Sequence, residues 1–249
     1  MRISQFLAII GSAQFGLSGP YDCHVYAIRG PGGIVLVDAG SGLAEIEVAQ
    51  HLAEDFPDVP VAAVLLTHSH ADHSGGADGL RHRYHCRVIA SDLTAPILQA
   101  ADEERSGLRR AREAGGYPPG LHMRPCSVDG VYRDGDHFMV AGLTFEAVQV
   151  RGHSHDSFCL IVEVNGHRIC FSADVVFYGG ILGVINAWDS SFQDYCVDLQ
   201  KLQGRSIEML FPGHGLFTLR DGQRHIEGAI QTLNNGFLPA QIGQGGGIF

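Results

Sequence analysis

The first 90 residues alternate short apolar runs with segments of helical periodicity. The runs 34–37 and 61–66 are entirely apolar, and each is followed by polar residues. Apolar runs of this length between turn signals predict buried strands. Apolar residues recur at helical spacing over 43–56 and Pro57 follows them, which predicts a helix that ends there. This alternation predicts a mixed sheet with helices on its faces.

The pattern of predicted elements changes in the middle of the chain. Ser91 precedes a helical pattern that continues to Ala114, so we expect one long helical region here, ended by the Gly/Pro-rich segment 115–120. The stretch that follows, to Pro125, predicts a loop, and long loops in compact domains often form lids or pocket walls. From 131 onward several strands are expected, and Asn165-Gly166 predicts a tight hairpin between two of them.

Composition narrows the function classes. The chain has 249 residues, which suits a single domain over 1–249, with a loose Gly-rich tail at 237–249. Its net charge is −10 without clusters of lysine and arginine, which argues against a nucleic-acid surface. No segment is long enough for a membrane span, and six scattered cysteines favour the cytoplasm over a disulfide framework. We expect a small-molecule substrate as partner, with a homodimer or higher homo-oligomer left open.

A dense group of metal-ligand side chains follows the second apolar run. His68, His70, Asp72 and His73 fall within six residues directly after the strand predicted over 61–66. Imidazole and carboxylate suit zinc, iron or manganese, and His68 and His70 can face one ion while the next pair faces a second. Gly75-Gly76 follows and would give the backbone freedom to turn tightly. The sequence therefore predicts a metal site at this strand end.

The second half of the chain supplies three more candidate ligands in the same structural position. His153, Asp174 and His214 each follow an apolar strand-like run. Any one of them alone would more often be an ordinary loop residue. Three at strand ends, added to the first cluster, indicate one extended ligand set.

These residues together resemble the metallo-β-lactamase superfamily over essentially the whole chain. The motif His-x-His-x-Asp-His is matched at 68–73, and the later family residues are matched by Gly-His153, Ala-Asp174 and Pro-Gly-His214-Gly. The element Val37-Asp38-Ala39-Gly40 is similar to the family's Asp-x-Gly, whose aspartate braces the metal loop from the second coordination shell. The resemblance implies an α/β fold, an αββα sandwich of two mixed β-sheets flanked by helices.

The resemblance also implies the division of ligands between two divalent ions, expected to be zinc, with iron or manganese as alternatives. The first ion would take His68, His70 and His153. The second would take Asp72, His73 and His214, with Asp174 bridging both. Two ions that share a carboxylate also share a water, whose pKa falls so that hydroxide exists near neutral pH. Asp72 could then pass the proton of this hydroxide to a leaving group.

We therefore predict a two-metal hydrolase that cleaves a thioester, lactone or ester bond of a small molecule, similar to the glyoxalase II-like and lactonase-like branches. Lactonases of the family commonly place a tyrosine three residues after the bridging aspartate, whereas this chain has Phe177 there and Tyr178 one later. Tyr178 is a candidate substrate contact. The alternatives are a mononuclear iron enzyme similar to persulfide dioxygenases, against which His214 argues, and a phosphoester hydrolase.

Overall fold

The structure is a computed structural model, and it describes residues 1–242. The chain divides into two compact units. The N-terminal unit comprises residues 1–132 and 140–142, and the C-terminal unit comprises residues 133–139 and the chain from 143 onward. Each unit is built around its own β-sheet, and each sheet contains both parallel and antiparallel strand pairs.

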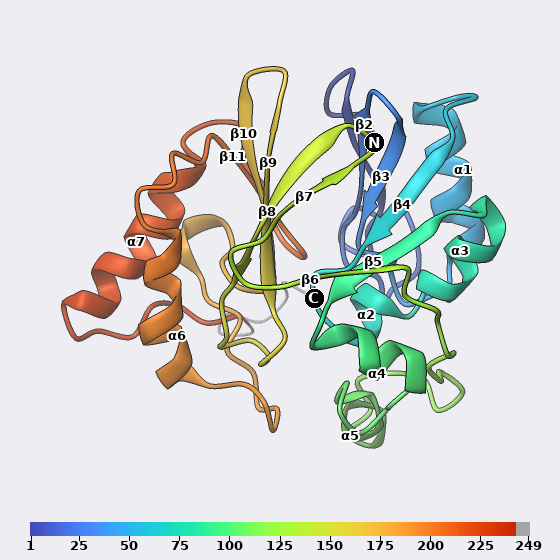
Figure 1. Cartoon of the computed structure of the whole chain (residues 1–249). Helices are drawn as coiled ribbons and strands as arrows, with labels where there is room; N and C mark the ends of the chain where they lie inside the picture. The colour runs from blue at the N-terminus through green and yellow to red at the C-terminus, as the bar shows by residue number, and fades with distance from the viewer. Residues whose placement is uncertain (243–249) are drawn as a thin grey trace. The chain divides into compact units, whose positions relative to one another are not determined.

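The sheet of the N-terminal unit has its strands in chain order (Figure 1). The first three strands pair antiparallel and the last three join in parallel, as expected where helices connect them. The strands are β1 (Leu7–Gly11), β2 (Val25–Gly30), β3 (Gly33–Val37), β4 (Val61–Leu65), β5 (Arg87–Ser91) and β6 (Gly130–Tyr132). Strands β3 and β4, predicted from the two apolar runs, lie side by side, so their carboxyl ends meet at one edge.

The helices of this unit cover a face of that sheet and fill the connections after it (Figure 1). They are α1 (Glu45–Asp55), α2 (Ala71–Ser74), α3 (Ala77–Tyr84), α4 (Thr94–Ala100) and α5 (Leu108–Glu113). Val48 and Leu52 of α1 are buried with strand residues such as Ile10 and Val25 in one hydrophobic cluster. Helix α1 therefore packs through the apolar stripe that its sequence predicted.

The single long helix predicted up to Ala114 is wrong. The structure has α4 and α5 with a turn between them, and the break begins at Ala101, whose φ is 49°. The Asp102 carboxylate accepts hydrogen bonds from the backbone N–H groups of Glu104 and Arg105, at 3.1 and 3.0 Å. An aspartate that bonds the backbone in this way competes with helical hydrogen bonding and favours a turn.

The sheet of the C-terminal unit has the order β11-β10-β9-β8-β7. Its strands are β7 (His137–Val140), β8 (Leu143–Gln149), β9 (Phe158–Val164), β10 (His167–Ala173) and β11 (Met209–Pro212). Strands β9 and β10 form the predicted hairpin, and its turn residues Asn165 and Gly166 have φ of 53° and 81°. Both central residues thus adopt the left-handed conformation that favours Asn-Gly.

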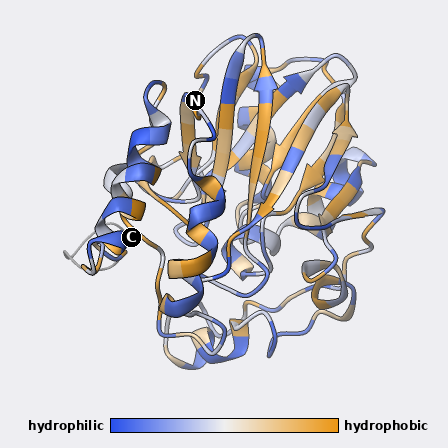
Figure 2. Cartoon of the chain, turned by 60° about the vertical axis from the view of Figure 1, so that its left-hand side comes forward, coloured by the Kyte–Doolittle hydropathy of each residue, from blue (hydrophilic) through white to orange (hydrophobic). Residues whose placement is uncertain are grey.

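Helices of the C-terminal unit pack on its sheet (Figure 1). They are η1 (Tyr178–Gly180), α6 (Phe192–Asp198), η2 (Leu199–Leu202) and α7 (Gly222–Asn234). Tyr195 and Leu199 share a buried cluster with Ile226 and Ile230 of α7 and with residues of β8 to β11. Figure 2 shows the strands as largely hydrophobic and the helices as a mixture of hydrophobic and hydrophilic residues, in keeping with helices that pack through one face.

The predicted tail at 237–249 is only partly described. Leu182 donates a backbone hydrogen bond to Ala240 and accepts one from Ile242, each at 2.9 Å, which ties this stretch to the C-terminal unit. Residues 243–249 lie outside the described residues. Within 1–242, no helix combines the length and apolar character needed to cross a bilayer.

Candidate metal centre

The first group of candidate ligands lies on the loop and short helix that follow β4. His68 and His73 are fully buried, and their ring centroids are 4.2 Å apart. The ring of His70 is 4.7 Å from that of His68. Asp72 and His73 lie on α2, where Oδ2 of Asp72 is 3.6 Å from Nε2 of His73. The four side chains therefore converge within the N-terminal unit.

Asp38, at the end of β3, holds this loop from behind. Its buried carboxylate accepts hydrogen bonds from the backbone N–H and the hydroxyl of Thr67, at 2.9 and 3.0 Å. Its other oxygen lies 2.8 Å from Nδ1 of His73. A carboxylate at this distance favours the tautomer with the proton on Nδ1, which leaves Nε2 with a lone pair for a metal. Asp38 thus lies where the sequence predicts a bracing aspartate.

Gly75 and Gly76 serve close packing rather than the tight turn expected from the sequence. Their φ values are −61° and −83°, which any residue can adopt. A Cβ on Gly75 would lie 2.4 Å from the carbonyl oxygen of Ser41, and one on Gly76 would lie 2.1 Å from that of Ala39. The glycines therefore let the metal loop approach the backbone that follows Asp38.

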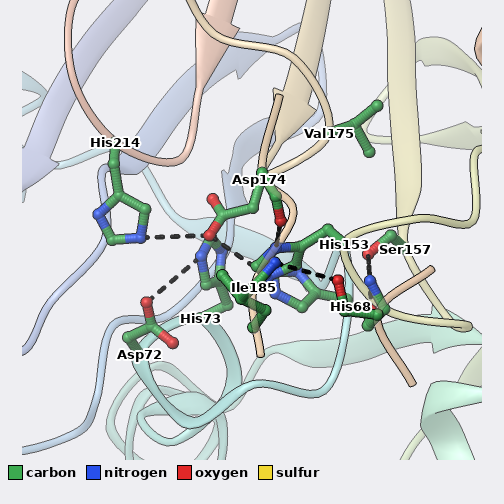
Figure 3. Close-up of polar contacts among 12 residues, drawn as sticks. His68, Asp72, His73, His153, Ser157, Asp174, Val175, Ile185 and His214 are labelled. Carbon is green, nitrogen blue, oxygen red and sulfur yellow. Dashed lines mark hydrogen bonds and ion pairs between the residues drawn. The ribbon is translucent and has the colours of Figure 1, made fainter. Parts of the chain in front are cut away.

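The second group of candidate ligands lies in the C-terminal unit and comes from three strand ends. His153 follows β8, Asp174 follows β10 and His214 follows β11. Asp174 lies between the two histidines (Figure 3): its Oδ2 is 3.5 Å from Nε2 of His153 and 3.5 Å from Nε2 of His214. All three residues are buried. One carboxylate oxygen of Asp174 thus faces two imidazoles.

Two glycines and a tyrosine hold this second group in place, a role that was not predicted from the sequence. Nδ1 of His153 lies 2.7 Å from the carbonyl oxygen of Gly183. A Cβ on Gly183 would lie 1.9 Å from the carbonyl oxygen of Asp174, and one on Gly152 would lie 2.2 Å from the ring of Tyr195. The Tyr195 hydroxyl donates to the carbonyl of Asp174 at 3.1 Å or that of Val175 at 3.0 Å. In the sequence, only the glycine directly before His153 hints at these contacts.

The separations between ligand atoms test whether divalent ions fit. Two ligand atoms about 2.1 Å from a tetrahedral zinc ion are roughly 3.4 Å apart. The separations within each unit, 3.6 Å for Asp72–His73 and 3.5 Å for each Asp174–His pair, match this value. The imidazoles of His73 and His153 also have Nδ1 engaged by an oxygen, which makes Nε2 the ring nitrogen that could bind a metal. The residues therefore fit divalent ions in kind and in the spacing measured within each unit.

Two further residues near the first group were not predicted from the sequence. The buried thiol of Cys23 groups with Asp38 and His73, and burial raises its pKa to about 12. The hydroxyl of Tyr117 donates a hydrogen bond to Oδ1 of Asp72 at 2.9 Å. Tyr117 lies 45 residues after Asp72, in the Gly/Pro-rich segment 115–120, so no local pattern could link them.

The candidate substrate contact Tyr178 lies on η1 in the C-terminal unit. Its ring centroid is 4.3 Å from that of His225 on α7, and 42% of the residue is exposed. The backbone N–H of Gly179 donates to Nδ1 of His225 at 3.0 Å, which fixes the turn. Burial lowers the pKa of His225, in keeping with a neutral ring that accepts this bond. A role of Tyr178 in substrate binding stays a prediction.

Comparison with curated proteins gives distant relatives of thioesterase type. An atrochrysone carboxyl ACP thioesterase of Aspergillus fumigatus is 29% identical over 211 residues, which are 83% of this chain and 40% of the relative. A similar thioesterase, nsrC of Aspergillus novofumigatus, is 26% identical over 73% of this chain and 45% of its own length. The chain spans less than half the length of these relatives. YobT of Bacillus subtilis, described as uncharacterized, is 25% identical over 95% of this chain and all of YobT.

Several solved structures of metallo-β-lactamases have the same fold. A mutant of the enzyme from Cronobacter sakazakii superposes with a TM-score of 0.71 at 17% identity and covers 95% of both chains. BJP-1 of Bradyrhizobium japonicum, a subclass B3 enzyme, gives 0.63 at 17% identity and covers 86% of both. The predicted fold class, with two mixed sheets flanked by helices, is confirmed. Because the family model of the metallo-beta-lactamase superfamily matches residues 18–214, which include every candidate ligand, the chain belongs to the metallo-beta-lactamase superfamily.

Proposed function

We propose that this chain is a two-metal hydrolase that cleaves a thioester, lactone or ester bond of a small molecule. The observation that carries the proposal is the position of Asp174, whose Oδ2 lies 3.5 Å from Nε2 of both His153 and His214. An oxygen in this position can be shared by two ions, each of which would also take one of the two imidazoles. The thioesterase names of the curated relatives agree with a hydrolase and favour the thioester among the three bonds.

We assign the ligands as the superfamily motif implies. One ion would be held by His68, His70 and His153, and the other by Asp72, His73 and His214, with Asp174 available to both. Zinc suits this nitrogen and oxygen donor set, and iron or manganese would also be accepted. Bound divalent ions supply a water of lowered pKa and a positive site for the oxyanion that develops on the carbonyl.

The residues of the chain do the remaining work. Asp38 fixes the orientation of His73 through the hydrogen bond at Nδ1, and the Gly183 carbonyl does the same for His153. The Asp72 carboxylate, which is partly accessible, accepts the proton of the attacking water and transfers it to the leaving thiolate or alkoxide as its bond to the carbonyl carbon breaks. A thiol is the better leaving group of the two, so this proton transfer matters least for a thioester.

Acid release measured by pH-stat tests the proposal. The substrates would be an acyl-pantetheine thioester, a lactoyl thioester, an acyl homoserine lactone and an aryl ester, each with and without chelator. We expect chelator-sensitive release from at least one of them, restored by zinc. His68→Ala should abolish the release, whereas His82→Ala should retain it, because the side chain of His82 on α3 is 75% exposed and lies outside the ligand set.

Metal analysis of the purified chain distinguishes the alternatives. Two ions per chain agree with the proposal. A single iron, combined with oxygen consumption on a persulfide, would replace it with the dioxygenase. Release of acid from a phosphodiester but from none of the four carbonyl substrates would replace it with a phosphoester hydrolase.

A further inference from the structure

Asp72 must present one particular oxygen to a metal ion, and its side chain has a partner outside the ligand set. We propose that Tyr117 is a positioning residue that fixes the carboxylate of Asp72, and that the loop carrying Tyr117 is held in place by Glu103. This inference rests on the proposed two-metal function. The inference adds Tyr117, a residue outside the ligand set, and makes retention of the ion assigned to Asp72 depend on it.

The hydrogen bond divides the two oxygens of Asp72 between different partners. The Tyr117 hydroxyl donates to Oδ1 at 2.9 Å, while Oδ2 lies 3.6 Å from Nε2 of His73. Rotation about the last side-chain bond of an aspartate is otherwise soft. A donor on Oδ1 therefore keeps Oδ2 directed toward the position that His73 also faces.

The aromatic ring of Tyr117 is held by its neighbours. It packs against the hydrophobic cluster of the N-terminal unit and lies 5.9 Å from the ring of Tyr21, tilted by 42°. The ring therefore fixes the direction of the hydroxyl before any ion binds, so little entropy is lost when the hydrogen bond forms.

A cluster around Glu103 anchors the loop on both sides of Tyr117. Arg112, on α5 before the loop, donates to Oε2 of Glu103 at 2.6 Å and to the carbonyl of Leu121 at 2.7 Å. Oε1 of Glu103 accepts from the backbone N–H of Met123 at 3.2 Å and lies 2.9 Å from Nδ1 of His122. Leu121 and Met123 are buried in the same hydrophobic cluster. The loop is thus closed by charged hydrogen bonds and by apolar burial.

The effect of losing the hydroxyl follows from the behaviour of residues that orient metal ligands. Removing such a partner typically lowers metal affinity roughly 10–100-fold. The effect should fall on the ion assigned to Asp72, because Tyr117 contacts Asp72. The ion assigned to His68 and His70 should be unaffected. A role limited to folding would instead lower thermal stability and leave metal retention in the folded chain unchanged.

Metal retention of the zinc-loaded chain tests this inference. Tyr117→Phe, its control Tyr21→Phe and the wild-type chain are titrated with a chelator, and bound zinc is counted by mass spectrometry. We expect Tyr117→Phe to lose one of its two ions at a chelator concentration roughly 10–100-fold lower than wild type does. Tyr21→Phe removes a hydroxyl from the neighbouring ring and should behave as wild type.

The same variants loaded with cobalt give a second readout. Visible absorption of cobalt reports its ligands, so Tyr117→Phe should change the spectrum of one of the two ions and leave that of the other unchanged. Identical retention and spectra in folded Tyr117→Phe and wild type would overturn the inference. A wild-type chain that holds fewer than two ions would instead overturn the proposed function, so the two failures are distinguishable.

Discussion

The two groups of candidate ligands reach a similar geometry by opposite routes. The N-terminal group lies within residues 68–73, on one loop and the short helix α2. The C-terminal group takes single residues from the ends of β8, β10 and β11, spread over the stretch 153–214. Both nevertheless have carboxylate-to-imidazole separations of 3.5 to 3.6 Å.

The difference lies in what holds each group. The N-terminal ligands are neighbours in the chain, and one side chain, Asp38, supports them through Thr67 and His73. The C-terminal ligands depend on strand pairing, including the irregular register between β10 and β11 next to Ala173, whose φ is 48°. Their support comes from backbone approaches at Gly152 and Gly183. The first group should therefore be sensitive to charge at Asp38 as well as to volume at Gly75 and Gly76, and the second mainly to volume.

Substitution of Asp174 should have the largest effect on activity and on bound metal. Asp174→Ala removes the oxygen that faces both His153 and His214. We expect hydrolysis to fall by more than the roughly 100-fold typical for loss of an outer partner, with bound zinc reduced below two per chain. Activity assays and metal counts would check this. Full activity with two bound ions would show that Asp174 does not bridge the ions.

The second largest effect is expected at Asp38, which supports the N-terminal group. Asp38→Asn should reduce zinc affinity roughly 10–100-fold, because an amide holds the His73 tautomer less well than a carboxylate. Asp38→Ala should in addition lose stability, because the φ of 63° at this position suits Asp and Asn better than Ala. Chelator titration and thermal melting measure the two effects separately. Equal zinc affinity in Asp38→Asn and wild type would contradict a role for the negative charge.

A change of volume should act on the C-terminal group. Gly183→Ala places a Cβ 1.9 Å from the carbonyl oxygen of Asp174 and 3.1 Å from Nδ1 of His153, so the backbone must shift. We expect a loss of about 1–3 kcal/mol in the free energy of unfolding, together with weaker zinc binding. Gly228→Ala is the matched control, since its Cβ meets nothing within 4 Å and it lies inside α7. That control should gain roughly 0.5–1 kcal/mol. Denaturant unfolding of both variants compares them, and equal stability would contradict the close approach.

The smallest effect concerns the loop that carries Tyr117. Hydrogen bonds from Arg112, and then from His122 and Met123, lower the pKa of Glu103 from its ordinary 4.5 to about 2. Because the folded-state pKa is depressed, this group contributes stability above pH 4.5 that is lost as the pH falls toward 2. Glu103→Gln should therefore be less stable than wild type at pH 7, by about 1 kcal/mol or less given the partial exposure, and the difference should shrink below pH 4.5. Unfolding of both chains at about pH 7 and about pH 3 measures this difference. A difference in stability between Glu103→Gln and wild type that does not depend on pH would exclude a contribution from the ionised Glu103 carboxylate.

Much of the fold could be predicted because its strands are strongly patterned. Runs such as 34–37 and 61–66, and the Asn165-Gly166 turn, carry their structure in local sequence, and the superfamily follows from the complete motif. The long helix up to Ala114 failed because a side chain, Asp102, diverts the backbone hydrogen bonds that periodicity assumes. Propensity describes helical faces and does not register such local competition.

The candidate ligands themselves were determined by the sequence, since imidazole and carboxylate side chains gathered at strand ends are typical of metal sites. Their support was decided only in three dimensions. Tyr117 reaches Asp72 across 45 residues, and Gly183 reaches His153 across 30, through contacts that no sequence period encodes. Metal ligands are limited to a few residue types, so the chain shows them directly. Residues that orient those ligands use common hydroxyls and backbone carbonyls, and only tertiary packing selects which of them are used.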